Sequence, residues 1–151
     1  MLDEAECERP ARPAPSAIVI HALAHAIGAL KAASRANRPI VLLSAPEAGV
    51  YAGPGWFRAL IETAGDEVPE ARFSAVLDCG EEPGAALAAI RAQIECVVFI
   101  GRADVAGRLA DIARQHGVRL ETERPANALD LGADFFASEE RVEQRCFDLL
   151  S

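Results

Sequence analysis

Eight residues of types that bind ligands or move protons either follow apolar runs of the sequence or lie in one glycine-rich stretch. In an open parallel sheet, ligands bind beyond the carboxyl ends of the strands, where residues directly after the apolar runs converge. The sequence therefore predicts a binding site for a small anionic ligand at this edge, with no reaction assigned. Its candidate residues are His21, Ser44, Tyr51, Gly53, Gly55, Trp56, Asp78 and Arg102.

The stretch from Ala45 to Trp56 contains three glycines and two aromatic residues, and we expect residues 44–55 to form a long loop. It leads into a helix whose first turn carries no acidic side chain. Free N–H groups and the positive end of that helix suit a phosphate or carboxylate, with Tyr51 or Trp56 as a wall of the pocket. The alternative is that the glycines serve a tight turn and that Trp56 fills the core.

The remaining polar candidates also have structural alternatives. Asp78 either binds a ligand or accepts hydrogen bonds from its own turn, and Arg102 either clamps an anion or pairs with Asp104 on the surface. His21 and His25 have the i, i+4 spacing that binds a metal when a third ligand joins them. No H-E-x-x-H sequence accompanies the pair, so we predict no metal and no cofactor.

Several enzyme classes lack their sequence motif. There is no G-x-S-x-G nucleophile elbow, no Walker A sequence and no G-x-G-x-x-G after the first apolar run. The only lysine, Lys31, lies in a helical pattern, whereas a Schiff-base aldolase or a phosphoacceptor receiver domain needs a lysine after a strand. A nucleophilic role for Cys79 is disfavoured because Glu81 and Glu82 would raise the pKa of its thiol. Whether the protein is an enzyme stays open.

The elements that would position these residues alternate between short apolar runs and helical periodicity, as in repeated βα units. We predict an α/β fold of about five mainly parallel strands with helices on both faces, a flavodoxin- or Rossmann-like three-layer sandwich. A partial (βα) barrel is the alternative. The predicted strands cover residues 17–20, 40–43, 73–77, 96–100 and 118–121. Helices are expected over residues 22–35, about 54–64 and about 85–94, then from an Asp104 cap to Gly117 and from a Ser138 cap onward.

Composition limits the partners. The 151 residues carry a net charge of −8, which disfavours a nucleic-acid footprint, and no apolar run approaches the roughly 20 residues of a membrane helix. Four widely separated cysteines fit a reducing compartment, and we expect Cys96 and Cys146 to be buried. The sequence thus predicts a cytoplasmic protein with a disordered, acidic, proline-rich tail over residues 1–15 and a single domain over residues 16–151.

Three segments together resemble a family of small bacterial α/β proteins to which no activity is assigned. They are residues 42–46 (LLSAP), 51–57 (YAGPGWF) and 75–80 (AVLDCG), within a likeness that spans about residues 17–120. The resemblance implies a βα fold and no more. As an alternative to ligand binding, we consider a non-enzymatic interaction module that forms a homodimer through residues 51–57 or through the terminal helix with Phe147, Leu149 and Leu150.

Overall fold

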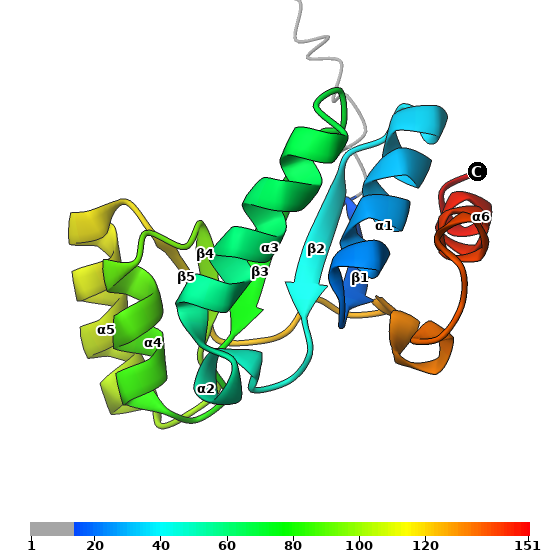
Figure 1. Cartoon of the computed structure of the whole chain (residues 1–151). Helices are drawn as coiled ribbons and strands as arrows, with labels where there is room; N and C mark the ends of the chain where they lie inside the picture. Colours follow the sequence, from blue (N-terminus) through cyan, green and yellow to red (C-terminus); the bar gives the residue numbers. More distant parts are fainter. Residues whose placement is uncertain (1–13) are drawn as a thin grey trace, which may run out of the picture.

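The protein is built on a six-stranded, all-parallel sheet, seen in the computed structural model, which describes residues 14–151 (Figure 1). The predicted tail therefore lies almost wholly outside the described residues. The strand order is β5-β4-β3-β2-β1-β6, and the α/β class predicted from the sequence is confirmed. The strands are β1 (Ser16–Ile20), β2 (Ile40–Ser44), β3 (Phe73–Asp78), β4 (Cys96–Val98), β5 (Arg119–Glu121) and β6 (Leu129–Asp130).

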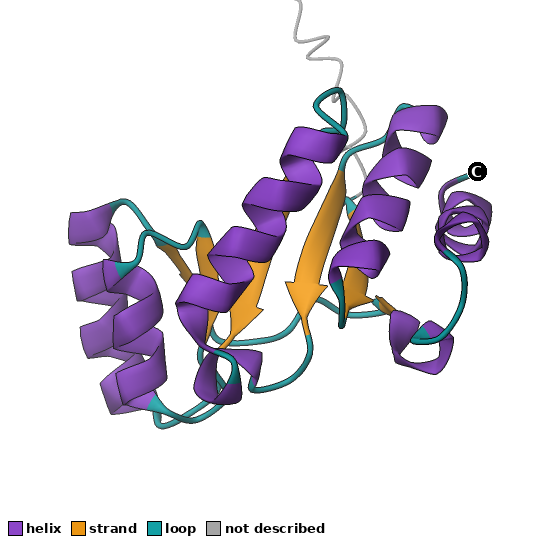
Figure 2. Ribbon diagram, viewed as in Figure 1, coloured by secondary structure: helices purple, strands orange, loops and turns teal. Residues whose placement is uncertain are grey.

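Helices connect the strands in the expected alternation (Figure 2). None of the helices in the described part of the chain is long and apolar enough to cross a membrane. They are α1 (Leu23–Ala36), α2 (Ala48–Tyr51), α3 (Gly53–Glu67), α4 (Pro83–Arg91), α5 (Ala103–His116), the 3-10 helix η1 (Leu131–Asp134) and α6 (Glu139–Leu150).

The helices cover one face of the sheet, and the expectation of helices on both faces was wrong. From β1 to β5 the chain always steps to the next strand in the same direction. Because such parallel crossovers are right-handed, each connecting helix lies on the same side. Figure 1 shows α1, α3 and α4 in front of the strands. Of the two arrangements left open by the sequence, the partial barrel is the one with this strand order from β1 to β5, and β6 departs from it by pairing with β1.

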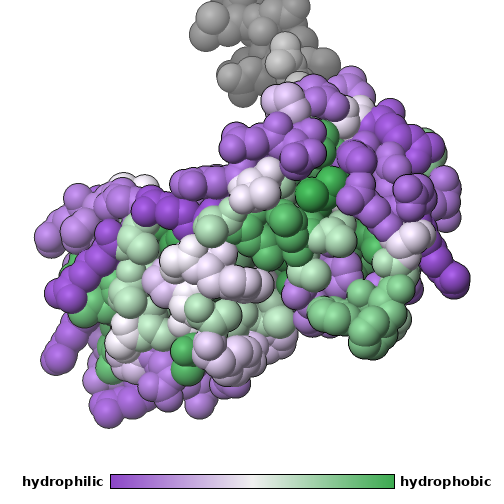
Figure 3. All heavy atoms as spheres, in the orientation of Figure 1, coloured by the Kyte–Doolittle hydropathy of each residue, from purple (hydrophilic) through white to green (hydrophobic). Residues whose placement is uncertain are grey.

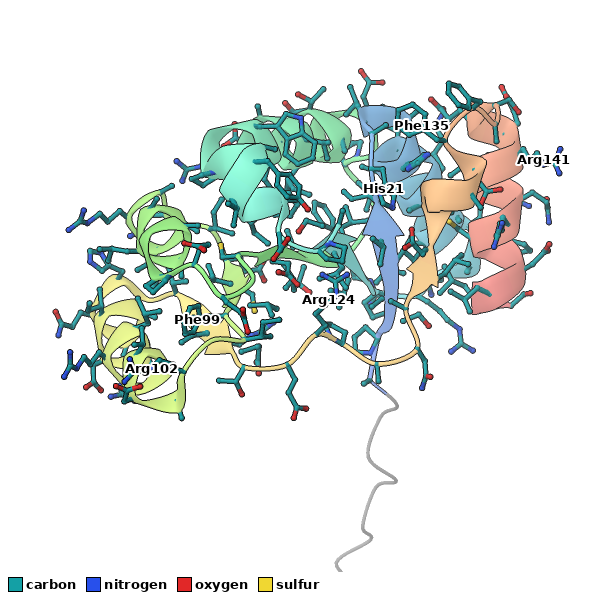
Figure 4. All side chains as sticks on the ribbon, turned by 90° about the horizontal axis from the view of Figure 1, so that it is seen from below. His21, Phe99, Arg102, Arg124, Phe135 and Arg141 are labelled. Atoms are coloured by element: carbon teal, nitrogen blue, oxygen red, sulfur yellow. The ribbon has the colours of Figure 1, made fainter. Side chains whose placement is uncertain are left out.

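The opposite, inner face of the sheet is crossed by residues 122–128, which we call the strap. The strap leads from β5 at one edge of the sheet to β6 at the other, where β6 pairs with β1. Figure 4 shows it running on the side of the strands away from the helices. The connection from β5 to β6, which crosses the whole sheet, therefore contains no helix, and the inner face is covered by this single segment.

Alternate residues of the central strands point to the two faces. The helix-facing side contributes Ile18, Leu42 and Leu77 to the main core, which all the large helices share. The inner face carries a smaller buried cluster of Val19, Leu43, Val76, Cys96 and Val98. Strands covered on both faces need apolar residues at every position, which explains the uninterrupted apolar run from residue 40 to residue 43.

Several helix ends follow the sequence signals, whereas two details differ. Gly117 ends α5 in the left-handed conformation, and the hydroxyl of Ser138 accepts a hydrogen bond from Arg141 N–H at the start of α6. Asp104 does not cap α5, because that helix already begins at Ala103. The expected loop over residues 44–55 is shorter than predicted: it contains the one-turn helix α2, and α3 begins at Gly53.

Helix α6 packs against α1 at the right of the molecule in Figure 1, where α6 is seen nearly end-on. The close approach requires a glycine: a Cβ at Gly28 would lie 2.8 Å from Cγ1 of Val142 and 3.3 Å from the carbonyl oxygen of Glu139. Across the same contact, Lys31 binds Glu139 at 2.5 Å, and the Arg35 guanidinium lies 4.2 Å from the Phe147 ring centroid. The only lysine therefore joins two helices.

We expect Gly28→Ala to destabilise the protein by about 1–3 kcal/mol, because the new methyl group overpacks against the rigid, buried Val142 side chain. Gly107→Ala is the matched control. A Cβ at Gly107 meets nothing within 4 Å, and alanine favours a helix interior by roughly 0.5–1 kcal/mol. Urea unfolding followed by circular dichroism measures both variants. Equal stability of the two would contradict the proposed packing.

Candidate functional site

The structure distributes the eight predicted site residues over separate places at the carboxyl edge of the sheet. Ser44 and Asp78 lie together and are buried, and His21 and Trp56 meet at one surface cavity. Tyr51, Gly53 and Gly55 lie in or next to helices α2 and α3, outside that cavity. Arg102 lies at the far side of the molecule from His21 (Figure 4).

Asp78 is the centre of the buried group. One carboxylate oxygen, Oδ1, accepts hydrogen bonds from Gly80 N–H at 2.7 Å and Glu47 N–H at 3.1 Å. The other oxygen, Oδ2, lies 2.6 Å from Nη1 of Arg124, a strap residue. Both oxygens are therefore occupied by partners from three different segments of the chain.

Ser44 completes this group at the neighbouring strand end. Its hydroxyl accepts the backbone N–H of Asp78 at 2.9 Å and donates to the carbonyl of Ala45 at 3.0 Å. Its own carbonyl accepts Nη2 of Arg124 at 3.2 Å. With Asp78 at 1% exposure and all these polar atoms paired, the group joins β2, β3 and the strap.

Breaking this group by Arg124→Gln should lower the free energy of unfolding by about 2–4 kcal/mol, because it leaves a buried carboxylate without its counter-ion. The reference variant is Arg141→Gln, whose side chain is exposed at the start of α6. Denaturant unfolding measures both. In the Asp78→Asn background, Arg124→Gln should cost less. An equal cost in both backgrounds would contradict a direct ion pair.

Cys79, next to Asp78, is buried as well. Burial and the neighbouring Asp78 charge raise the pKa of its thiol to about 12. A thiol with this pKa is protonated at neutral pH and is a poor nucleophile. The prediction from the sequence that Cys79 is a poor nucleophile agrees with this environment, although the causes are burial and Asp78 and not the expected Glu81 and Glu82.

His21, at the end of β1, forms the second group. Its Nε2 lies 2.6 Å from Oδ1 of Asp130, and the same carboxylate oxygen accepts Gly132 N–H at 2.8 Å. Partial burial acts to raise the pKa of Asp130, but these two hydrogen bonds outweigh it and hold the pKa below its usual value. An ionised Asp130 keeps the proton on Nε2 of neutral His21 and leaves Nδ1 with a lone pair. Asp130 therefore orients the His21 ring and leaves Nδ1 as its second hydrogen-bonding atom.

His25 lies behind His21 and is buried. Its Nδ1 accepts the backbone N–H of His21 at 3.1 Å, so neutral His25 carries its proton on Nε2, which has no partner among the described residues. The Phe135 ring stands edge-on, 6.0 Å from His25 between centroids. Burial lowers the pKa of His25, and the nearby Asp134 only partly opposes this. His25 thus holds the backbone of His21 at the end of β1. Residues 14–151 contain no group of three His, Cys, Asp or Glu side chains that could hold a metal.

This burial predicts acid sensitivity. Below the ordinary histidine pKa of 6.5 the unfolded chain binds a proton that folded His25 resists, so stability should fall as the pH drops below that value. In His25→Gln the midpoint of thermal unfolding should change less between pH 7.5 and pH 5 than in the wild type. His116→Gln, an exposed position, is the control. Identical pH slopes for the wild type and His25→Gln would refute the assignment.

His21 also borders a surface cavity of about 290 Å³ between the starts of α1 and α3. Trp56, 39% exposed, forms one wall, and the first residues of α1 form another. Ala22 caps α1 without a side-chain hydrogen bond, and the first turn holds no acidic residue. The N–H groups of Leu23 and Ala24 have no acceptor within the described residues. The full lining is His21, Ala22, Leu23, Trp56, Ala59, Leu60 and Thr63.

The other predicted residues have structural roles. The Tyr51 hydroxyl donates a hydrogen bond to the carbonyl of Pro46, and its ring is 70% exposed. Gly53 takes a φ of 84°, which turns the chain from α2 into α3. Arg102 is exposed and pairs with Asp104 through Nη2 to Oδ2 at 2.8 Å, as in the structural alternative.

Sequence reasoning missed two residues that organise this edge. Arg124 and Asp130 both lie between the strand predicted over residues 118–121 and the helix predicted from Ser138, where no periodicity indicates an element or a partner. The one available signal was indirect. Asp78 follows a run of buried residues, and a buried carboxylate needs a cation or several donors.

Comparison with solved structures supports the fold. The chain is similar to a protein named as a fructose-1,6-biphosphate aldolase from Coccidioides immitis, with a TM-score of 0.59 and 16% identity over 70% of this chain and 39% of that one. It is also similar to a protein named as a tagatose 6 phosphate kinase from Sinorhizobium meliloti 1021, with a TM-score of 0.53 and 17% identity over 90% of this chain and 45% of that one.

These similarities define the class of fold: an α/β protein similar in fold to part of an aldolase-type barrel. The chain spans less than half the length of either structure, and at this identity the likeness concerns the fold alone. No protein-family profile and no curated sequence matches the chain.

Proposed function

We propose that the protein binds a small anionic metabolite, a phosphate ester or carboxylate, in the cavity formed by His21, Trp56 and the start of α1. The single observation that carries this proposal is the meeting of an imidazole, a helix N-terminus without a cap and an exposed indole in one cavity of about 290 Å³. Helix N-termini favour anions because their N–H groups and the macrodipole point toward the ligand.

Each part of the cavity has a distinct role in this proposal. The N–H groups of Leu23 and Ala24 donate to the anion, and protonated His21 adds a charge-assisted hydrogen bond. Asp130 orients the His21 ring through the 2.6 Å contact. The indole of Trp56 covers the apolar body of the ligand. Arg124 and Asp78 take no part, because they are committed to each other.

The test is a titration with glycerol 3-phosphate and 3-phosphoglycerate followed by ¹H–¹⁵N NMR. The amides of Leu23 and Ala24 and the Trp56 indole N–H should shift most. His21→Asn should weaken binding about tenfold, because a hydrogen bond to a charged group is lost. His116→Asn, on α5, should leave the affinity unchanged. Absence of shifts at millimolar ligand, or shifts centred elsewhere, would refute the proposal.

A homo-oligomeric interaction module is the second candidate. The observation that favours it is the apolar surface beside the same cavity: Phe136 is 98% exposed, Phe135 51% and Leu23 38%. Figure 3 shows apolar residues at the lower right of this face. In contrast, Phe57 and Leu150, named above as dimer contacts, are buried in the core. Analytical sedimentation of the wild type and of Phe136→Ser tests the interaction module against the anion-binding function. The interaction module requires a wild-type dimer that the Phe136→Ser substitution dissociates into monomers.

A further inference from the structure

A second cavity, of about 300 Å³, lies on the inner face of the sheet beneath the strap. Its floor is apolar and consists of Val41, Val76 and Cys96, from three adjacent strands. Its walls come from β5 and the strap: Arg119, Glu121, Glu123, Arg124 and Pro125. This cavity is on the opposite face of the sheet from the helix layer and shares no residue with the cavity at His21.

The charged residues of the cavity walls differ in how fully they are paired with other protein groups. Arg124 is committed to Asp78 and to the carbonyl of Ser44. Arg119 is more than half exposed, and its Nε lies 3.5 Å from Oε1 of Glu121, too far for a good hydrogen bond. Among the described residues, Glu123 forms no ion pair. One guanidinium and one or two carboxylates are therefore available to a ligand.

Arg119 also stands beside the apolar floor. It is the β5 residue in register with Cys96 of β4, and both residues line the cavity. Burial raises the pKa of the Cys96 thiol, and the neighbouring Arg119 guanidinium acts in the opposite direction. A carboxylate bound by Arg119 would hold the rest of a small molecule against Val41 and Val76.

The balance of charge selects the kind of ligand. The charges of the four ionised wall residues sum to zero, and Asp78, which lies behind Arg124, adds one negative charge. A dianion such as a phosphate ester would meet the repulsion of Glu121 and Glu123. A molecule with one carboxylate, one ammonium group and an apolar body can pair with the basic wall, the acidic wall and the apolar floor at the same time. A cavity of this size is at the small end of ligand pockets, which run from about 300 Å³ upward.

We propose that the cavity beneath the strap binds a free α-amino acid with an aliphatic side chain. The carboxylate pairs with Arg119, the ammonium group with Glu123 and Glu121, and the side chain packs against the apolar floor at Val41 and Val76. This proposal is independent of the anion site at His21.

Isothermal titration calorimetry with L-leucine tests the proposal on the full chain. Leucine should bind, whereas 4-methylpentanoate, which lacks the ammonium group, and 3-methylbutylamine, which lacks the carboxylate, should each bind at least about tenfold more weakly. Equal binding of leucine and 4-methylpentanoate would overturn the proposal, because a simple anion would then suffice. So would the absence of leucine binding at millimolar concentration.

Variants locate the binding. Arg119→Gln and Glu123→Gln, both at exposed positions that the fold does not need, should each weaken leucine binding about tenfold. Val41→Phe should abolish it by filling the cavity, in a protein whose thermal unfolding stays cooperative. Arg114→Gln, on the outer face of α5, and His21→Asn are controls that should bind leucine normally. Full affinity in Arg119→Gln, or lost affinity in His21→Asn, would place the amino acid elsewhere and refute the assignment.

Discussion

The buried ion pair between Asp78 and Arg124 is the interaction on which the two halves of the structure depend. It lies at the end of β3, and it holds the strap against the inner face through a carboxylate that three segments share. A buried ion pair contributes little net stability compared with apolar packing, yet it is geometrically demanding. Here it fixes where the strap crosses the sheet, and thereby where β6 meets β1 and where Asp130 meets His21.

The one-sided helix layer gives the sheet two different surfaces. On the outer side, helices bury the strands, and the cavity at His21 lies where α1 begins beside α3. On the inner side a single extended segment covers five small and medium apolar residues. A helix would fill that space with its own side chains. A strap leaves a shallow cavity with an apolar floor and charged walls, which is a different chemical environment from the helix-side cavity.

The sequence predicted most of the elements and part of the site. The apolar run at residues 40–43 and the Gly117 and Ser138 signals are local, so periodicity and capping chemistry located them correctly. The strand predicted over residues 96–100 is present as β4 but ends at Val98. Strand order is not local. Whether successive strands step in one direction depends on packing between distant segments, and the two-residue β6 is too short for any periodicity to indicate it.

Packing between distant segments also explains why the sequence did not predict the partners of the site residues. Asp78 and Ser44 were recognised by their position after strands, and both do lie at the carboxyl edge. Their partner Arg124 is 46 residues away from Asp78, in a segment without a pattern. A residue that follows a strand is equally placed to face a ligand or to secure the next segment, and only the position of the strap decides between these roles.

The contact between α1 and α6 has a consequence for how the chain is made. More than a hundred residues separate Gly28 from Val142, and 109 separate His21 from Asp130. During synthesis from the N-terminus, β1 and α1 therefore emerge long before the segment that covers their outer edge. Until α6 arrives, the glycine-containing stripe of α1 stays uncovered and β1 is an open sheet edge, which another chain can pair with. Contacts of such long sequence separation also slow folding, because a large loop must close before they form. The covering of β1 and α1 is thus a late event set by β6 and α6.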